Sequence, residues 1–452
     1  MKTKNLSYTS IIFLHIILGI LLYLNSKISI PYGLAILSIG LLTILKTENS
    51  KNQVLYICGY VIGSEVVIRM TGGYILYEIG KYSIIIFMLM GVYFSGFSKN
   101  SFLYWIFLII LIPGVLVATV TLNLDTNIVK AIAFNVSGPI CLGVCALYCY
   151  QRRITLQELD NVLLCILLPV LTTVTYMFLV TPNVKEVIIS TQSNSRTSGG
   201  FGPNQVATIL GLGVFILFTR LIFHSKEKWI IVTNLALLFI VAFRGLVTFS
   251  RGGMICSAVM MVLFFVVLFS VTKRSAKVKI LWLIGISSFL FLVIWSYSMS
   301  QSNGLISNRY ANQDAIGRTK SSLLTGREEI MSNEFGLFLE NPIMGAGVGK
   351  GKENRIEELG ETVASHNEIT RMLAEHGSFG VLGMLILIIT PLVLYINNKQ
   401  NIYLLSFFTF WILTINHAAM RLAAPAFVYA LSLLHVYSIE EQIKLNEILE
   451  EK

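Results

Sequence analysis

One polar stretch of the sequence, ASHNEITRMLAEHGSFG, carries residue types that can move a proton and bind an anion. Its residues of chemical interest are His366, Asn367, Glu368 and Arg371. Ser365 and Glu368 have the spacing of a capping box, which predicts a helix that starts at His366 and stops at Gly377. The positive end of a helix dipole disfavours imidazolium, so His366 would be neutral and able to accept a proton. His366 is therefore the first candidate base, and Glu368 the second because capping would occupy it.

Arginines in three other segments could bind a phosphate-bearing ligand, because the guanidinium fork matches phosphate oxygens. Arg251 lies in VTFSRGGMICSAV between two apolar segments, and burying such a charge costs about 2.5 kcal/mol or more, which favours a functional role. The alternative is an interfacial turn from which Arg251 reaches lipid headgroups. Arg421, in NHAAMRLAAPAF, is a second trapped charge, with a structural role at a helix end as the equal alternative. Arg196 opens RTSGGFGPNQ, an irregular backbone before a helix whose exposed amides favour an anion.

These residues are embedded in a chain dominated by apolar segments. It is 55% hydrophobic and 13% charged, whereas soluble domains carry about a quarter charged residues. Runs of about 18 to 22 apolar residues recur, and a helix of that length spans the hydrocarbon layer. Backbone groups in lipid must pair internally. We therefore predict an all-α polytopic membrane protein with about 12–14 transmembrane helices.

The candidate helices can be placed from the apolar runs. They cover residues 8–25, 29–46, 53–70, 80–97, 102–121, 131–150, 160–181, 204–222, 229–248, 253–271, 279–297, 377–396, 401–418 and 422–437. The weakest candidates are the segment at 53–70, which contains Glu65 and Arg69, and the short last segment.

The basic residues orient these helices. The formal charge is +10, but Lys and Arg recur in every second short loop, which fits the positive-inside rule rather than a nucleic-acid partner. The amino terminus is then cytoplasmic, and two long loops lie outside. Such loops are functional or disordered, and we expect the second to be a folded cap. The predicted parts are 1–181 amino-terminal helices, 182–203 outer loop, 204–297 central helices, 298–376 large extracytoplasmic loop, 377–437 carboxyl-terminal helices and 438–452 cytoplasmic tail.

Other polar features of the sequence predict structural roles. Arg309, Arg318 and Arg355 in the large loop are expected to be solvated charges. All six cysteines lie in apolar runs and are expected to be small core residues; we predict neither a metal nor a cofactor. The run ENPIMGAGVGKGK lacks the spacing of a phosphate-binding loop, so its glycines are expected to allow close packing or the approach of a ligand.

The outer motifs together resemble the O-antigen ligase and O-antigen polymerase (Wzy-type) family of bacterial glycan-transferring membrane proteins. The motifs are RTSGGFGPNQ at 196–205, TFSRGG at 248–253, LTGREEI at 324–330, NPIMGAGVG at 341–349 and SHNEITRMLAEHGSFG at 365–380. They follow in the expected order, with one large late outer loop. The family often has an aromatic residue after the arginine of the third motif, where this chain has GREEIM.

The resemblance implies an inverting, GT-C-like glycosyltransferase in the bacterial cytoplasmic (inner) membrane, with its active site facing outside. It implies an undecaprenyl-diphosphate-linked oligosaccharide as donor and an acceptor glycan, with no metal. It assigns Arg251, Arg327, Arg196 and Arg421 to the diphosphate and makes His366 the base. A flippase and a chain-length regulator are further candidate partners.

We predict a polysaccharide polymerase of the integral-membrane type. Three alternatives to it stay open at this point. A ligase that moves a finished glycan to lipid A core, another lipid or a protein shares the donor and the chemistry. A flippase or secondary transporter would carry internal repeats and midplane charges. A scaffold would tolerate loss of Arg251 or His366. O-antigen, capsule and exopolysaccharide remain equal as products.

Overall fold

The computed structural model describes residues 7–225, 227–320, 322, 327–359, 365–418 and 420–437. Within these ranges, ten helices are long and apolar enough to cross a membrane, and three shorter apolar helices accompany them. These helices coincide with every predicted apolar segment except the last. The predicted all-α polytopic membrane class is confirmed. The predicted acidic tail lies outside the described residues.

The last predicted helix is wrong in its second half. Helix α19 (Ala424–Leu431) has eight residues, about 12 Å of helix, which is too short to span a bilayer. Beyond it, strand β2 (His435–Tyr437) pairs in parallel with β1 (Arg153–Thr155), a segment expected to be a plain cytoplasmic loop. Short β-branched and aromatic stretches favour such pairing, which a search for apolar runs does not detect.

The chain divides into two compact units. Unit 1 comprises residues 1–47, 51–80 and 160–321, and unit 2 comprises 48–50, 81–159 and 322–452. The segment predicted as the large loop, 298–376, contributes residues to both units, and its described part contains several helices.

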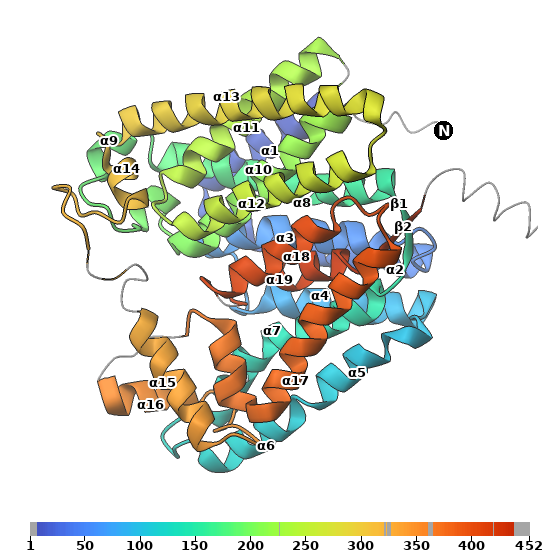
Figure 1. Cartoon of the computed structure of the whole chain (residues 1–452), viewed down its shortest axis with the longest axis vertical. Coiled ribbons are helices and arrows are strands. Elements are labelled where there is room, and N and C mark those ends of the chain that lie inside the picture. The colour runs from blue at the N-terminus through green and yellow to red at the C-terminus, as the bar shows by residue number, and fades with distance from the viewer. Residues whose placement is uncertain are drawn as a thin grey trace, which may run out of the picture. The chain divides into compact units, whose positions relative to one another are not determined.

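Unit 1 is built around long apolar helices. Its main elements are α1 (Tyr8–Leu24), α2 (Ser29–Thr47), α3 (Gln53–Met70), most of α8 (Leu156–Val180), α9 (Val184–Val187), α10 (Pro203–Phe223), α11 (Lys228–Leu246), α12 (Arg251–Val271), α13 (Lys277–Gln301) and α14 (Leu305–Tyr310), with short 3₁₀ turns at Ser26–Ile28, Arg196–Ser198 and Arg274–Ala276. Helix α10 packs against α11 and α12 (Figure 1). A Cβ added to Gly253 would lie 2.1 Å from the carbonyl oxygen of Ala207, so glycine permits the close approach of α12 to α10.

Unit 1 also explains the charges in the weak candidate helix. Glu65 and Arg69 lie four residues apart on α3 and form a buried ion pair at 2.7 Å. Neighbouring charges of opposite sign at this spacing meet on one face of a helix, which makes their burial tolerable. The segment at 53–70 is therefore a membrane-type helix with an internal ion pair.

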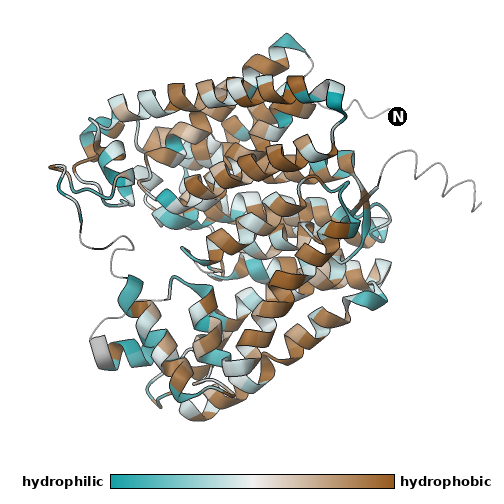
Figure 2. Ribbon diagram, in the orientation of Figure 1, coloured by the Kyte–Doolittle hydropathy of each residue, from teal (hydrophilic) through white to brown (hydrophobic). Residues whose placement is uncertain are grey.

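Unit 2 combines apolar helices with a polar helical region. Its elements are most of α4 (Ile79–Ser95), the 3₁₀ turn Lys99–Ser101, α5 (Phe102–Ile109), α6 (Ile112–Thr121), α7 (Ile128–Cys149), β1, α15 (Arg327–Glu340), α16 (Lys350–Leu359), α17 (Glu368–Asn397), α18 (Leu404–Ile415), α19 and β2. Helices α15 and α16 pack against each other and against α17 (Figure 1). Figure 2 shows that α15 and α16 are more hydrophilic than the long apolar part of α17.

Glycine breaks the long helix of unit 2 without ending it. Gly377 has φ 58° and ψ −135°, a conformation that glycine alone adopts readily, and α17 bends there. A Cβ at this position would also lie 2.6 Å from the carbonyl oxygen of Ile343. The predicted stop at Gly377 is thus a kink between a polar first part and an apolar second part.

The cysteines match their predicted role as core residues. Five of the six, all except Cys165, are buried, and none is in a disulfide. In the part of the chain that the structure describes, no group of three or more His, Cys, Asp or Glu side chains could hold a metal ion.

Candidate functional site

The helix that begins near His366 starts later than predicted. Asn367 is its N-cap, and the Oδ1 atom of Asn367 accepts a hydrogen bond from the backbone N–H of Ile369 at 2.9 Å. The Ser365 hydroxyl instead accepts from the backbone N–H of Asn367 at 3.3 Å. Asparagine caps a helix as well as serine does, and Ser365 forms a local turn. The predicted capping box is therefore wrong: His366 lies before the helix, and Glu368 is its first residue.

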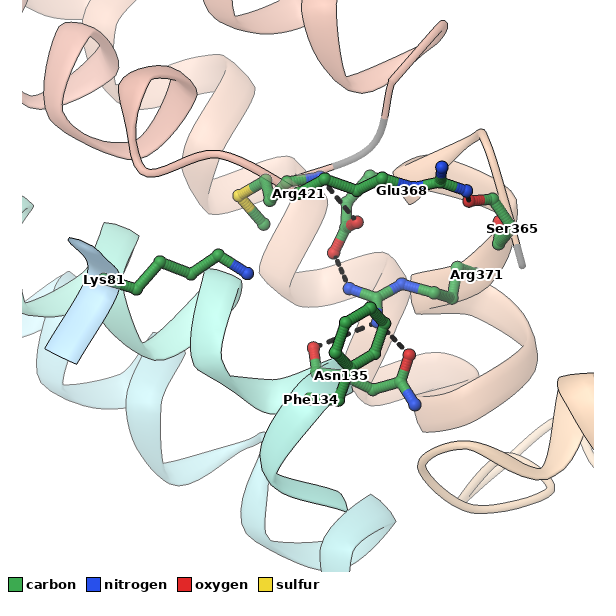
Figure 3. A pocket seen from close by; sticks show the side chains of 8 residues that line it. Lys81, Phe134, Asn135, Ser365, Glu368, Arg371 and Arg421 are labelled. Carbon is green, nitrogen blue, oxygen red and sulfur yellow. Dashed lines mark hydrogen bonds and ion pairs between the residues drawn. The ribbon is translucent and has the colours of Figure 1, made fainter. Parts of the chain in front are cut away.

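Glu368 and Arg371 form a buried polar cluster that joins α17 to α7. Arg371 donates to Glu368 and also to the backbone oxygen and Oδ1 of Asn135, at 3.0 and 2.8 Å (Figure 3). Glu368 accepts a further bond from the backbone N–H of Met420 at 3.4 Å. These bonds hold unit 2 together. They give Glu368, Arg371 and the capping residue Asn367 structural tasks, while their predicted contacts with substrate stay predictions.

The imidazole of His366 is surrounded by positive charge. Burial, Arg421, Arg327 and further cationic neighbours lower the pKa of His366 to about 3. Its Nδ1 atom is buried and has no hydrogen-bond partner among the described residues. This pKa makes His366 neutral at pH 7, as predicted. Desolvation and nearby arginines disfavour the imidazolium.

The arginines near His366 come from separate segments of the chain. Arg421 donates to the backbone oxygen of Ser365, the residue before His366, at 3.0 Å. Arg327 begins α15. Arg355 of α16 is 3% exposed and forms an ion pair with Glu334 at 2.9 Å, so the prediction that it is a solvated loop charge is wrong. Its partner is distant enough in the sequence that spacing gave no indication of the pair.

A cavity of about 350 Å³, counted with the space open to solvent, lies beside this cluster (Figure 3). It is lined by Lys81, Phe134, Asn135, Ser365, Glu368, Arg371, Met420 and Arg421. Lys81 is a residue that the sequence reasoning missed. Its side chain is buried, and its Nζ atom donates to the Ser137 hydroxyl at 3.1 Å. Lys81 stands at the start of a predicted apolar segment, a position typical of an ordinary charge at a helix end, so only the fold shows that it is buried.

The glycine-rich loop before α16 supports the polar part of α17. Gly345 and Gly347 have positive φ, and a Cβ on Gly345 would lie 2.4 Å from the carbonyl oxygen of Glu375. The backbone N–H of Gly349 donates to the Glu375 carboxylate at 2.8 Å. Of the two predicted uses of these glycines, close packing is the one that the structure shows, and the approach of a ligand stays a prediction.

Two predicted motifs meet within unit 1. The hydroxyl of Ser250, in TFSRGG, donates to Oδ1 of Asn204, in RTSGGFGPNQ, at 2.8 Å. Ser250 is the N-cap residue of α12 and Arg251 is its first residue. The sequence does not predict this pairing, because 46 positions separate the two residues.

Arg251 has an arginine neighbour that the sequence did not indicate. Arg251 donates from Nη1 to the backbone oxygen of Arg309 at 3.3 Å, and Arg309 donates from Nε to the backbone oxygen of Phe249 at 3.0 Å. Phe249 has φ 58°, which is unusual for a residue other than glycine. The expectation that Arg309 is a solvated loop charge is therefore wrong, because its guanidinium group braces the turn before Arg251.

Arg196 lies in the irregular backbone expected for its motif. It begins a short 3₁₀ turn, and its backbone oxygen accepts from the Thr181 hydroxyl at 2.8 Å. Gly199 and Gly200 follow with φ of 68° and 85°. Arg196 and Arg251 belong to unit 1, whereas Arg327, His366, Asn367, Glu368, Arg371 and Arg421 belong to unit 2.

The apolar helices and buried polar clusters define a polytopic membrane protein with charged sites in both units. The family model described as O-antigen ligase matches residues 235–385 of this chain. This match supports the O-antigen ligase/polymerase family and confirms the resemblance drawn from the motifs. No curated protein matches the chain.

The matched range contains Arg251, Arg327 and His366, while Arg196 and Arg421 lie outside it. Members of the family are glycosyltransferase-like enzymes that act on lipid-linked glycans in a membrane. A ligase- or polymerase-type function is therefore supported in general terms.

Proposed function

We propose that the chain is a polysaccharide polymerase of the bacterial cytoplasmic (inner) membrane. It transfers a glycan from an undecaprenyl-diphosphate-linked donor to a hydroxyl of an acceptor glycan. The observation that carries this proposal is the convergence around His366 in unit 2. Arg327 and Arg421 come from other segments, yet both lower the pKa of that imidazole. A neutral base and cations suited to a departing diphosphate thus share one neighbourhood.

The proposed reaction uses His366 as the general base. The acceptor oxygen attacks the anomeric carbon as its proton passes to His366, and the bond from that carbon to the diphosphate oxygen breaks with inversion. Arg327 and Arg421 offset the charge that develops on the leaving lipid diphosphate. Arg251 and Arg196 are proposed as further diphosphate ligands. No metal enters this scheme.

The low pKa of His366 suits a base that is switched on by the donor. With the donor absent, burial and then the charges of neighbouring arginines make His366 a weak base by lowering its pKa to about 3. A bound diphosphate would offset the positive charge of the arginines, and the pKa of His366 would rise by the part of the shift that they cause. The imidazole would then accept the proton best when the donor is in place.

The predicted topology adds support for a reaction outside the membrane. Lys81, Asn135, His366 and Arg421 all map to predicted outer ends of helices or to the large outer loop. The donor would then be held in the bilayer by its lipid. A flippase and a chain-length regulator remain proposed partners.

A ligase is the second candidate, because the matching family model is described as O-antigen ligase. Reconstitution of the full chain with a purified lipid-diphosphate oligosaccharide separates the two. A ladder of longer lipid-linked products supports the polymerase, and transfer to an added non-donor acceptor supports the ligase. Lipid-linked glycan that stays unchanged while the lipid crosses the bilayer would contradict both.

A further inference from the structure

Helix α15 is buried on one side and carries exposed apolar side chains on the other. Glu334 and Leu337 are buried, and Leu337 shares a core cluster with Ala374 of α17. Phe335 and Leu339 are 48% and 63% exposed, and residues four positions apart lie on the same face of a helix. The core of unit 2 thus uses one face of α15 and leaves an apolar face exposed.

The character of this exposed face changes along α15. Glu328 and Ser332 occupy it in the first two turns, and both are exposed. Exposed apolar side chains occupy it from the third turn onward and continue into the following loop: Phe335, Leu339, Ile343 and Met344. We call these four residues the Phe335 face. Exposed apolar side chains gathered in one place mark an interaction surface, and the change from polar to apolar fits a boundary between water and lipid.

Hydrogen bonds place the Phe335 face at the point where the apolar part of α17 begins. The backbone N–H of Ser378 donates to the backbone oxygens of Pro342 and Ile343, at 2.8 and 3.1 Å. The Ser378 hydroxyl also donates to the backbone oxygen of Ile343, at 2.9 Å. Ser378 directly follows the kink at Gly377. Ile343 therefore lies beside the first residue of the apolar part of α17.

The apolar part of α17 has a row of exposed side chains that starts at Ser378, which is itself exposed. Leu382, Leu385 and Ile389 follow at helical spacing, and each is between 44% and 51% exposed. This segment belongs to a helix long and apolar enough to cross a membrane, so these side chains face lipid. The Phe335 face thus continues a lipid-facing surface onto the polar region of unit 2.

We infer that the Phe335 face is a docking surface for bilayer lipid, which holds the end of α15 at the boundary between headgroups and acyl chains. The leaflet is the one in which the apolar part of α17 begins, predicted to be the outer one. Glu340 is exposed beside Leu339 and limits insertion to the roughly 5–10 Å that is typical of interfacial helices. This contact does not depend on a transferase activity.

The test uses the full chain in phosphatidylcholine nanodiscs that hold one copy each, with an environment-sensitive dye on an introduced cysteine. Leu339→Cys reports on the Phe335 face. Ser332→Cys is the matched control, because Ser332 lies on the same side of α15 about 10 Å nearer its start. Five of the six native cysteines are buried, and the wild-type chain treated with the same dye gives the background.

A nitroxide on the phosphatidylcholine should quench the dye of Leu339→Cys several-fold more than the dye of Ser332→Cys. Iodide in the water should quench the two dyes in the reverse order. No lipid diphosphate is present in these nanodiscs, so quenching by the nitroxide identifies bilayer lipid rather than the tail of a donor. A nitroxide near the headgroup should also quench the dye of Leu339→Cys more than one near the end of the acyl chain.

Equal lipid quenching of the two variants overturns the inference, and so does iodide quenching that is strongest in Leu339→Cys. A dye in Leu339→Cys that neither quencher reaches overturns it as well, because protein then covers the face. Stronger quenching from the end of the acyl chain contradicts an interfacial depth. Both side chains are exposed, so neither change should lower the unfolding temperature, and Ile343→Cys replaces Leu339→Cys if that variant does not fold.

Discussion

In unit 2 the buried arginines face carboxylates, whereas in unit 1 the arginines beside the TFSRGG motif face backbone carbonyls. Arg355 pairs with Glu334, and Arg371 pairs with Glu368. Arg251 and Arg309 bond instead to neutral oxygens. A carboxylate partner offsets the charge of a guanidinium group and fixes its position, while a carbonyl partner orients the group. Unit 1 also contains one pair of the first kind, Glu65 and Arg69. Arg251, a proposed diphosphate ligand, thus has surroundings that differ from those of the framework arginines in unit 2.

The framework of unit 2 has a consequence for His366. Buried pairs are rigid but contribute little net attraction for a ligand, because their charges cancel. Three arginines lower the pKa of His366. Arg355 is paired with Glu334, whereas we propose that Arg327 and Arg421 bind the diphosphate directly. This arrangement fits a base that is held in place and kept neutral until an anion arrives.

The largest expected effect is loss of transfer on removal of the proposed base. His366→Ala should lower the rate of glycan transfer by about 10²- to 10⁴-fold, the usual contribution of a general base. The affinity for inorganic diphosphate should stay unchanged, since the proposed diphosphate ligands Arg251, Arg327 and Arg421 are intact. His417→Gln is the control, because His417 is also a part-buried histidine near Arg327, but its Nδ1 bonds to the backbone oxygen of Leu413.

Single-turnover rates and diphosphate titrations on the same preparations measure these two effects. Full activity of His366→Ala would remove the base assignment. A loss of diphosphate affinity as large as the loss of rate would show instead that His366 holds the anion.

Loss of a framework carboxylate should destabilise unit 2. Glu334→Gln leaves Arg355 buried without its ion-pair partner, and such a change costs about 3–5 kcal/mol. The side chains of this pair are 4% and 1% exposed. Asp314→Asn in unit 1 is the matched change, and it should leave unfolding unaltered because Arg318 is 76% exposed.

Thermal unfolding in detergent checks this pair of variants. The double variant Arg355→Leu/Glu334→Leu should recover much of the lost stability, because no charge is then left unpaired. Equal unfolding temperatures for Glu334→Gln and Asp314→Asn would show that the contrast between the units does not hold.

The helices could be predicted from the sequence because long apolar runs have one stable form in lipid. The capping at the start of α17 could not, because Ser365 and Asn367 are both good caps and their spacing does not rank them. The final β2 pairing could not be predicted either, since its partner β1 lies far away in the chain.

The candidate site was predictable only where a residue is unusual in its own segment. Arg251 and Arg421 stand out as charges between apolar runs. Arg309 and Arg355 do not, because their importance comes from distant neighbours, Phe249 and Glu334. A lysine at a helix start, such as Lys81, reads as an ordinary end charge until the fold buries it.

Acid should weaken unit 2 through its histidines. The pKa of folded His366 is about 3, below the 6.5 of the unfolded chain. The unfolded chain therefore binds a proton between these values while the folded chain does not, so stability falls as pH falls from 6.5. His366→Gln should remove about 1 kcal/mol of the loss between pH 7 and pH 5, allowing for partial exposure.

Unfolding temperatures at pH 7 and pH 5 and constant ionic strength test this difference. His366→Gln should therefore lose less stability than the wild type over this interval. Identical acid sensitivity of the wild type and His366→Gln would show that the fold does not hold this imidazole neutral.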